Sequence, residues 1–260
     1  PSMTQSRREA LRRQQQAQAR AKRFQRIIIV GAIVLAVVVV GVFGTIFVSQ
    51  LNRGNTADPG TSAAVPVNAT ADRDGITVNP GKFAAGVPKV EIFVDYQCPI
   101  CKQFEGMFGA TLDEMAGKGE IQLIYRTMTF LDNNLKNDSS LKAGVAAACA
   151  DNSGKYSAYH NAIFAGQPAT EGTGYTTQQL RVDFAGTAGI TGAALSTFQQ
   201  CYDNRVTSGF VQGTNEAAAK DQVNSTPTVM VNGTKLDNNK VFQSSVDVFK
   251  QTLLTTKGNG

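Results

Sequence analysis

Residues 87–104, VPKVEIFVDYQCPICKQF, join an apolar segment directly to two cysteines. Val90, Ile92 and Val94 share one side of this segment and Phe93 takes the other, which predicts a central strand over residues 87–95. After the first cysteine, apolar residues recur about every 3.6 positions, which predicts an amphipathic helix. These residues are Ile100, Phe104, Phe108, Leu112 and Met115. Both thiols therefore lie at a strand-to-helix junction.

The rest of the C-terminal part alternates strand and helix patterns. Short apolar runs predict strands at 76–78, 121–126 and 228–231, and an Asn-Gly pair after the last one predicts a hairpin with a short strand near Lys235. Residues 138–222 show helical periodicity throughout, and a closing helix is expected over 243–254. This order predicts an α/β domain over 76–258 with a helical insertion between its strands.

The N-terminal part has a different composition. Residues 27–48 are 22 consecutive residues without a charge, long enough for a transmembrane helix, although a cleaved signal peptide remains an alternative. Eight basic residues and one acid precede them, so we expect residues 1–26 to stay in the cytoplasm and the C-terminal part to lie outside the plasma membrane. The alternative for the basic tail, nucleic-acid binding, is disfavoured because topology already accounts for its charge. Residues 49–75 have the composition of a flexible linker.

Four cysteines in an oxidising compartment either pair or react. For Cys98 and Cys101, a metal site would need two further ligands at suitable spacing, and the single histidine, His160, has no partner histidine. Covalent haem attachment would need histidine where Lys102 stands. For Cys98 and Cys101 this leaves a structural disulfide or a redox-active pair, and their position at the start of a helix favours redox chemistry. A thiol at a helix N-terminus faces free backbone amides, which lower cysteine pKa values into the range of about 3.5 to 7.5. We expect Cys98 to be acidic and Cys101 to be less exposed.

A second motif precedes the strand at 228–231. In Ser225-Thr226-Pro227-Thr228, a proline removes a backbone donor that an ordinary strand would use. A plain trans-proline turn is the alternative. Taken together, the segments VPKVEIFVDYQCPICKQFEGMF, GKYSAYHNAIFAGQP, LSTFQQCYDN and STPTVMVNG resemble the DsbA-like thiol:disulfide oxidoreductases of the thioredoxin-fold superfamily, in their membrane-anchored actinobacterial form. The resemblance spans roughly residues 78–256.

The resemblance implies a thioredoxin fold with a mixed central sheet and an inserted helical domain. It implies that Cys98 is the nucleophile and Cys101 the resolving thiol. It also implies a cis peptide between Thr226 and Pro227, and substrate contacts from Thr226, Pro227, Pro99 and Ile100. Cys149 and Cys201 resemble a second pair, which we expect to form a structural disulfide; two separate buried thiols are the alternative. We expect no metal and no other cofactor.

Two departures from the family pattern are visible. Ile100 stands where many members have histidine, so we expect a milder oxidant than the strongest members. Ile92 stands where a buried acid often assists proton transfer; Glu91 and Asp95 lie nearby, and the sequence does not choose between them. His160 sits in a segment that the family uses for packing, so a structural role is favoured.

Three functions are consistent with these residues. The first is an extracytoplasmic enzyme that donates the Cys98-Cys101 disulfide to exported proteins and is reoxidised by a membrane partner of the DsbB or vitamin K epoxide reductase type. The second is an isomerase or reductase, which the polar linker disfavours because it is no dimerisation module. The third is a binding module without enzymatic activity. Nucleic acid is not an expected partner.

Overall fold

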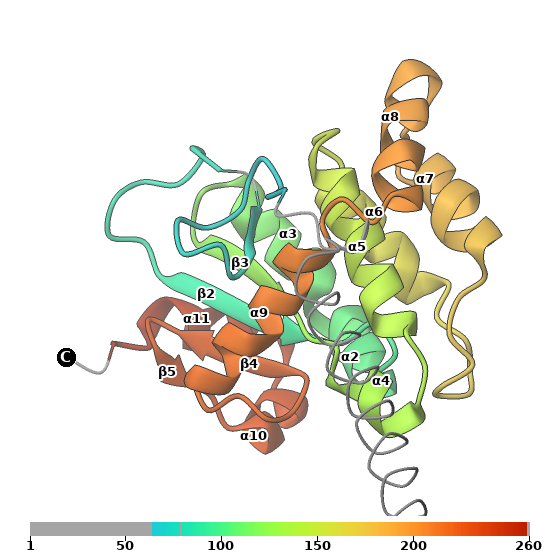
Figure 1. Cartoon of the computed structure of the whole chain (residues 1–260). Helices are drawn as coiled ribbons and strands as arrows, with labels where there is room; N and C mark the ends of the chain where they lie inside the picture. Colours follow the sequence, from blue (N-terminus) through green and yellow to red (C-terminus); the bar gives the residue numbers. More distant parts are fainter. Residues whose placement is uncertain (1–63, 79, 259–260) are drawn as a thin grey trace, which may run out of the picture. The chain divides into compact units, whose positions relative to one another are not determined.

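The computed structural model describes residues 64–78 and 80–258 (Figure 1). Their sheet has the strand order β1-β3-β2-β4-β5. β2 and β3 are parallel, whereas the other neighbouring pairs are antiparallel, so the sheet is mixed, as the sequence predicts. The strands are β1 (Ile76–Val78), β2 (Lys89–Val94), β3 (Gln122–Thr127), β4 (Thr228–Val231) and β5 (Thr234–Lys235).

Helices follow β2, fill the connection between β3 and β4, and close the chain. The first group is α2 (Pro99–Phe104), the π-helical turn η1 (Glu105–Gly109) and α3 (Ala110–Gly117). The connection holds α4 (Phe130–Leu135), α5 (Ser139–Asp151), α6 (Tyr156–Ala165), η2 (Gln179–Asp183), α7 (Phe184–Thr187), α8 (Gly192–Asp203) and α9 (Ser208–Lys220). The last two are α10 (Asn238–Gln243) and α11 (Val246–Thr255). In Figure 1, α5 to α8 stand to one side of the sheet.

The two faces of β2 are buried against different helices. Val90, Ile92 and Val94 belong to the main core, together with Phe104 and Phe108 of the cysteine-bearing helix. The ring of Phe108 stacks at 4.2 Å on that of Phe249 from α11. Phe93 points to the opposite face and packs with Ala218 of α9. The alternation of the sequence thus places β2 at the centre of the sheet and aims its C-terminal end at the cysteines.

The helical insertion differs from its prediction at two points. It begins earlier than residue 138, because the segment after β3 forms α4, which is capped by Lys136 in a left-handed conformation (φ 54°). It is also not helical throughout, since residues 166–176 form neither helix nor strand. Gly172 and Gly174 in this loop have positive φ values of 84° and 68°, which glycine adopts readily. The loop carries two residues of the candidate site, Gln167 and Tyr175.

The predicted linker at 49–75 is wrong at its C-terminal end. Asn68 donates from its backbone and its side chain to the two carboxylate oxygens of Asp151 on α5, each at 2.8 Å. Ala69 also bridges to Ile76 at the start of β1. Because Asp151 is buried and these contacts satisfy its charge, residues 64–75 are held on the domain despite their polar composition.

The predicted transmembrane segment at 27–48 and the basic tail at 1–26 lie outside the described residues. Within residues 64–78 and 80–258, none of the helices has the length and apolar character needed to cross a membrane.

Candidate active site

Cys98 and Cys101 occupy the start of the helix that follows β2. Cys98 is the N-cap residue with extended backbone angles, and Pro99 takes the first helical position, where its missing amide proton costs no hydrogen bond. Both cysteines are free thiols. Cys98 is 7% exposed, whereas Cys101 is fully buried, so an attacking sulfur can reach only the first of them.

The environments of the two thiols separate their acidities. The pKa of Cys98 falls to about 6, chiefly because the Cys101 thiol donates a hydrogen bond to it; the backbone amides of Cys101 and Ile100 and the hydroxyl of Thr226 add to the effect, while burial opposes it. Burial, together with the neighbouring Cys98, raises the pKa of Cys101 well above its usual value. At pH 7 Cys98 is therefore mostly a thiolate beside a protonated Cys101. The position of Cys98 at the helix start predicts the contribution of the amides, whereas the larger contribution of the Cys101 thiol depends on the folded geometry.

The loop before β4 lies against Cys98. The Thr226–Pro227 peptide bond is cis, the isomer that the resemblance implied. The sulfur of Cys98 lies 3.6 Å from the carbonyl oxygen of Thr226. The Oγ1 atom of Thr226 is buried and has no hydrogen-bond partner among the described residues. Asn238 at the start of α10 donates to the carbonyl oxygen of Pro227 at 2.8 Å and fixes the far side of this loop.

Pro99 and Ile100 form the open rim of the site. Both side chains are exposed, and Ile100 retains 48% of its accessible surface. A large aliphatic side chain this exposed beside a buried sulfur offers apolar contact area to an approaching polypeptide.

Of the two acids that the sequence left open, Asp95 is the one that lies next to the cysteine loop. Ile92 is in the core. Glu91 lies on the other face of β2 from Ile92, where it forms ion pairs with Arg126 at 2.6 Å and Lys89 at 3.0 Å. Asp95 is fully buried just before the cysteine loop. Burial raises its pKa to about 7, against hydrogen bonds from the Ser140 hydroxyl and the amides of Gln97 and Leu131.

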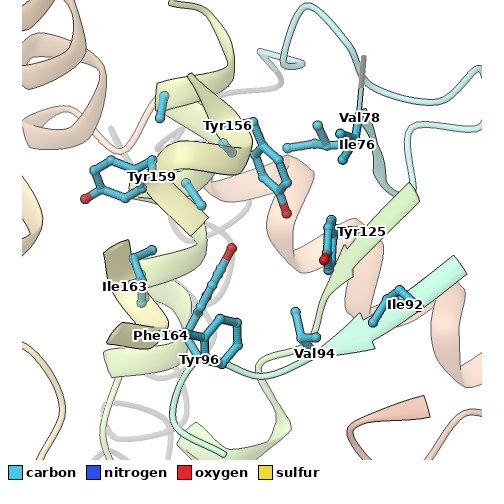
Figure 2. Close-up of a cluster of buried hydrophobic side chains, with 14 of the residues drawn as sticks. Ile76, Val78, Ile92, Val94, Tyr96, Tyr125, Tyr156, Tyr159, Ile163 and Phe164 are labelled. Carbon is cyan, nitrogen blue, oxygen red and sulfur yellow. The ribbon is translucent and has the colours of Figure 1, made fainter. Parts of the chain in front are cut away.

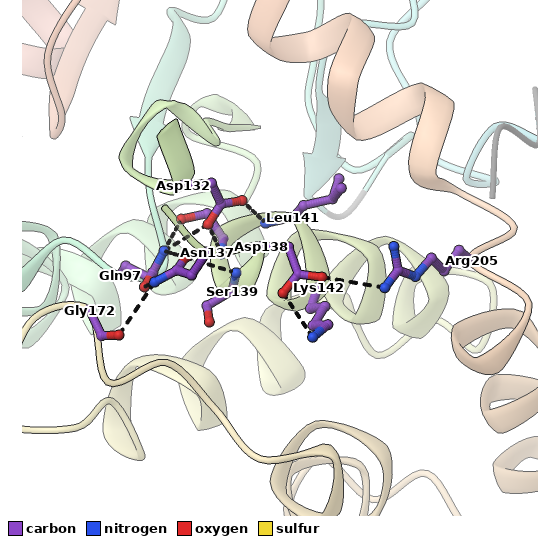
Figure 3. Close-up of polar contacts among 10 residues, drawn as sticks. Gln97, Asp132, Asn137, Asp138, Ser139, Leu141, Lys142, Gly172 and Arg205 are labelled. Atoms are coloured by element: carbon purple, nitrogen blue, oxygen red, sulfur yellow. Dashed lines mark hydrogen bonds and ion pairs between the residues drawn. The ribbon is translucent and has the colours of Figure 1, made fainter. Parts of the chain in front are cut away.

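A polar network around Gln97 joins the cysteine loop to the helical insertion (Figure 3). The side-chain nitrogen of Gln97 lies 2.8–2.9 Å from acceptor oxygens of Asp132, Asn137 and Ser140, so its two N–H groups are shared among three acceptors. Ser140 in turn donates its hydroxyl to Asp95 at 2.6 Å and its amide to Asp132 at 2.8 Å. Because this network satisfies two buried or half-buried carboxylates at once, it fixes the position of the loop that carries Cys98.

The backbone carbonyls of the cysteine loop also have side-chain donors. Gln167 donates to the carbonyl oxygens of Tyr96 at 2.8 Å and Cys98 at 3.0 Å, and Tyr175 donates to that of Tyr96 at 2.6 Å. Sequence reasoning missed these donors, because they lie 69–79 residues away from the carbonyls in the chain. The one signal in the sequence concerns Gln97, a polar residue directly before Cys98, which could have been examined as part of the site.

His160 belongs to a buried aromatic cluster behind the cysteine helix. Its Nδ1 atom lies 3.0 Å from the hydroxyl of Tyr96, and its Nε2 atom lies 3.5 Å from Glu105. The rings of Tyr96, Tyr125 and Tyr156, which Figure 2 shows, have their centroids 5.5, 4.2 and 5.8 Å from that of His160. Since His160 is 1% exposed, its position matches the packing role that the sequence favoured.

Cys149 and Cys201 form a disulfide that joins α5 to α8, with their Cα atoms 5.9 Å apart. This is the pairing that the resemblance implied. Within the described residues, no group of three or more histidine, cysteine or acidic side chains is placed to hold a metal ion.

A family model described as thioredoxin matches residues 77–248. The chain belongs to the thioredoxin family. No curated protein matches it. Among solved structures, the family fold recurs in MdbA, a thiol-disulfide oxidoreductase from Corynebacterium diphtheriae, at 20% identity and a TM-score of 0.57, over 70% of this chain and 95% of that one.

Two further structures share the fold of this thioredoxin-family chain. Reduced DsbA from Mycobacterium tuberculosis is 24% identical with a TM-score of 0.53, and the match covers 69% of this chain and 99% of that chain. MdbA from Actinomyces oris is 20% identical with a TM-score of 0.60, over 78% and 97% of the two chains. These likenesses concern the fold, over 69–78% of this chain.

Proposed function

We propose that this thioredoxin-family chain is a DsbA-like thiol:disulfide oxidoreductase that donates the Cys98-Cys101 disulfide to exported proteins. The observation that carries the proposal is the contrast in acidity between the two thiols. A pKa of about 6 at Cys98 stabilises the reduced, ionised enzyme. Each unit of depression makes the disulfide about 30 mV more oxidising. The names of the structural neighbours support the same reaction class.

The exchange runs in two steps that each break one disulfide bond. A substrate thiolate attacks the sulfur of Cys98 in the oxidised enzyme, and Cys101 leaves and takes a proton. A second substrate thiolate then attacks the substrate sulfur of the mixed disulfide, and Cys98 leaves as a thiolate. Two electrons pass from the substrate to the enzyme. The low pKa of Cys98 makes it the better leaving group in the second step.

Thr226, Pro227, Pro99 and Ile100 would hold the substrate. The backbone next to Pro227 offers hydrogen-bonding groups to an extended chain, and the exposed Ile100 offers apolar contact. Asp95 is the nearest buried acid in the sequence to Cys98. Its pKa of about 7 suits it to exchange protons near neutral pH.

The proposed location is the outer face of the plasma membrane, with residues 27–48 as a single anchor and residues 1–26 in the cytoplasm. The support is the uncharged stretch and the basic residues before it. A membrane protein of the DsbB or vitamin K epoxide reductase type would accept the electrons and restore the disulfide.

Two assays with the purified chain test the proposal. The oxidised enzyme should oxidise reduced ribonuclease faster than it repairs scrambled ribonuclease, and its potential in glutathione buffer should lie well above the value of about −270 mV typical of thioredoxin. Faster repair of scrambled ribonuclease would assign it instead as an isomerase. A potential near that of thioredoxin would overturn disulfide donation.

A further inference from the structure

Gln167 is the residue of the helical insertion that contacts the cysteine loop on both sides of Cys98. Its side-chain nitrogen carries two N–H groups, and each has a carbonyl acceptor: Tyr96 at 2.8 Å and Cys98 at 3.0 Å. Its own backbone carbonyl accepts a hydrogen bond, at 2.9 Å, from the ammonium group of Lys102 in α2. Gln167 is 6% exposed, so these contacts are sheltered from water.

The carbonyl of Cys98 matters because it belongs to the reacting residue. Its oxygen also accepts the first helical hydrogen bond, from the amide of Lys102 at 3.2 Å. The orientation of this carbonyl sets the entry of the chain into α2 and hence the positions of the amides of Ile100 and Cys101, which stabilise the Cys98 thiolate. A donor on the carbonyl also offsets its negative partial charge close to the sulfur.

Tyr175 completes the arrangement from the same loop. Its hydroxyl donates to the carbonyl of Tyr96 at 2.6 Å, whereas the side-chain donor to the carbonyl of Cys98 is Gln167. The other ionisable groups around this contact are Lys102, Asp95 and the two thiols. Lys102 binds the backbone carbonyl of Gln167, and Asp95 accepts a hydrogen bond from Ser140. The side-chain amide of Gln167 is a neutral donor and takes part in neither of these contacts.

We propose that Gln167 is a positioning residue for disulfide exchange: its amide fixes the carbonyls of Tyr96 and Cys98 and so holds the sulfur of Cys98 against the first amides of α2. The inference rests on the proposed function for its catalytic meaning. The helical insertion thereby contributes to the chemistry of the cysteines, because its loop at 166–176 determines how well the thiolate is stabilised.

The test compares the ionisation of Cys98 in the purified, reduced chain and in three variants. Gln167→Met keeps the length of the side chain and removes both donors. It should raise the midpoint of Cys98 alkylation by about half a unit to one unit, so that the alkylation rate at pH 5 falls about three- to tenfold. Tyr175→Phe should cause a smaller shift, because it leaves the donor to Cys98 in place. Gln178→Ala, on an exposed glutamine of the same insertion, should cause none.

Thermal unfolding of each variant separates positioning from packing. If Gln167→Met lowers the unfolding temperature but leaves the Cys98 midpoint unchanged, the role is structural and the proposal is wrong. If Gln167→Met does not fold, Gln167→Glu tests the same contact: its carboxylate faces two carbonyl oxygens, and it should raise the Cys98 midpoint more than the loss of the amide does. An unchanged midpoint in Gln167→Glu would also overturn the proposal.

A potential measurement distinguishes failure of this inference from failure of the proposed function. A tenfold loss of thiolate stabilisation in Gln167→Met should make the potential about 30 mV more reducing. If the unmodified chain does not oxidise ribonuclease but the variant still shifts the Cys98 midpoint, the function fails and the positioning role stands. If the chain oxidises ribonuclease and the midpoint does not move, the positioning role fails alone.

Discussion

The two cysteine pairs of this chain differ in what surrounds their sulfur atoms. Cys98 caps a helix, where the Cys101 thiol and backbone amides lower its pKa, with a smaller contribution from the Thr226 side chain. Cys149 and Cys201 lie within α5 and α8, among buried side chains, and the hydrogen bond that the described residues show at the sulfur of Cys149 is a weak one, with the Thr207 hydroxyl at 3.7 Å. Donors favour a thiolate and hence an easily reduced disulfide, whereas their absence favours a lasting bond. Disulfide chemistry therefore serves reaction at Cys98 and Cys101 and stability at Cys149 and Cys201.

The largest expected difference is in activity. Cys98→Ser should reduce ribonuclease oxidation to the uncatalysed rate, because no other sulfur of the pair is exposed to substrate. The matched variant Cys201→Ser should retain the activity of folded protein. If both substitutions abolished oxidation in folded protein, the two pairs would not have separate roles.

The second difference is in stability. Replacing Cys149 and Cys201 together by alanine removes a cross-link between residues 52 apart, and the free energy of unfolding should fall by about 4 kcal/mol. Urea denaturation of the otherwise unmodified chain measures this loss. The midpoint of Cys98 alkylation should stay the same, since the disulfide donates nothing to that sulfur. A shifted midpoint would show that the pairs are coupled.

The titration of Asp95 distinguishes the surroundings of Cys98 from those of the Cys149–Cys201 disulfide. Its pKa is raised from 3.8 to about 7, so between these values the folded chain holds a proton that the unfolded chain has lost. Stability should therefore fall as pH rises from about 4 to 7, by about 1.4 kcal/mol per unit for one proton. Asp95→Asn should flatten this slope, whereas Asp132→Asn should leave most of it. Urea denaturation at several pH values measures both, and an unchanged slope in Asp95→Asn would contradict the assignment.

The smallest expected effect belongs to Thr226. Thr226→Val keeps the shape of the side chain and removes the hydroxyl that helps lower the pKa of Cys98. The midpoint of Cys98 alkylation should rise by about half a unit, the equivalent of one weak hydrogen bond. Thr228→Val, which loses a hydrogen bond to Ser225 instead, serves as the control. Equal shifts in both variants would point to a general disturbance of the loop.

The sequence predicted what local pattern determines. Alternation at Val90, Ile92 and Val94 identified β2, and the helix start at Cys98 identified the acidic thiol, because both depend on neighbours in the chain. It misjudged residues 64–75, where one contact between Asn68 and Asp151 outweighs a polar composition. The donors from Gln167 and Tyr175 follow from tertiary packing, and the 166–176 loop that carries them has no periodic signal. The sequence thus indicated the reacting cysteines better than the residues that hydrogen-bond to the loop carrying them.

The pH dependence of Cys98 alkylation in the purified, reduced chain tests the central claim most directly. Iodoacetamide should modify Cys98 with a midpoint near pH 6 and leave the buried Cys101 unmodified. A midpoint near 8.5, the value of free cysteine, would show that the fold does not stabilise the thiolate and would contradict the account of how this chain gives up its disulfide.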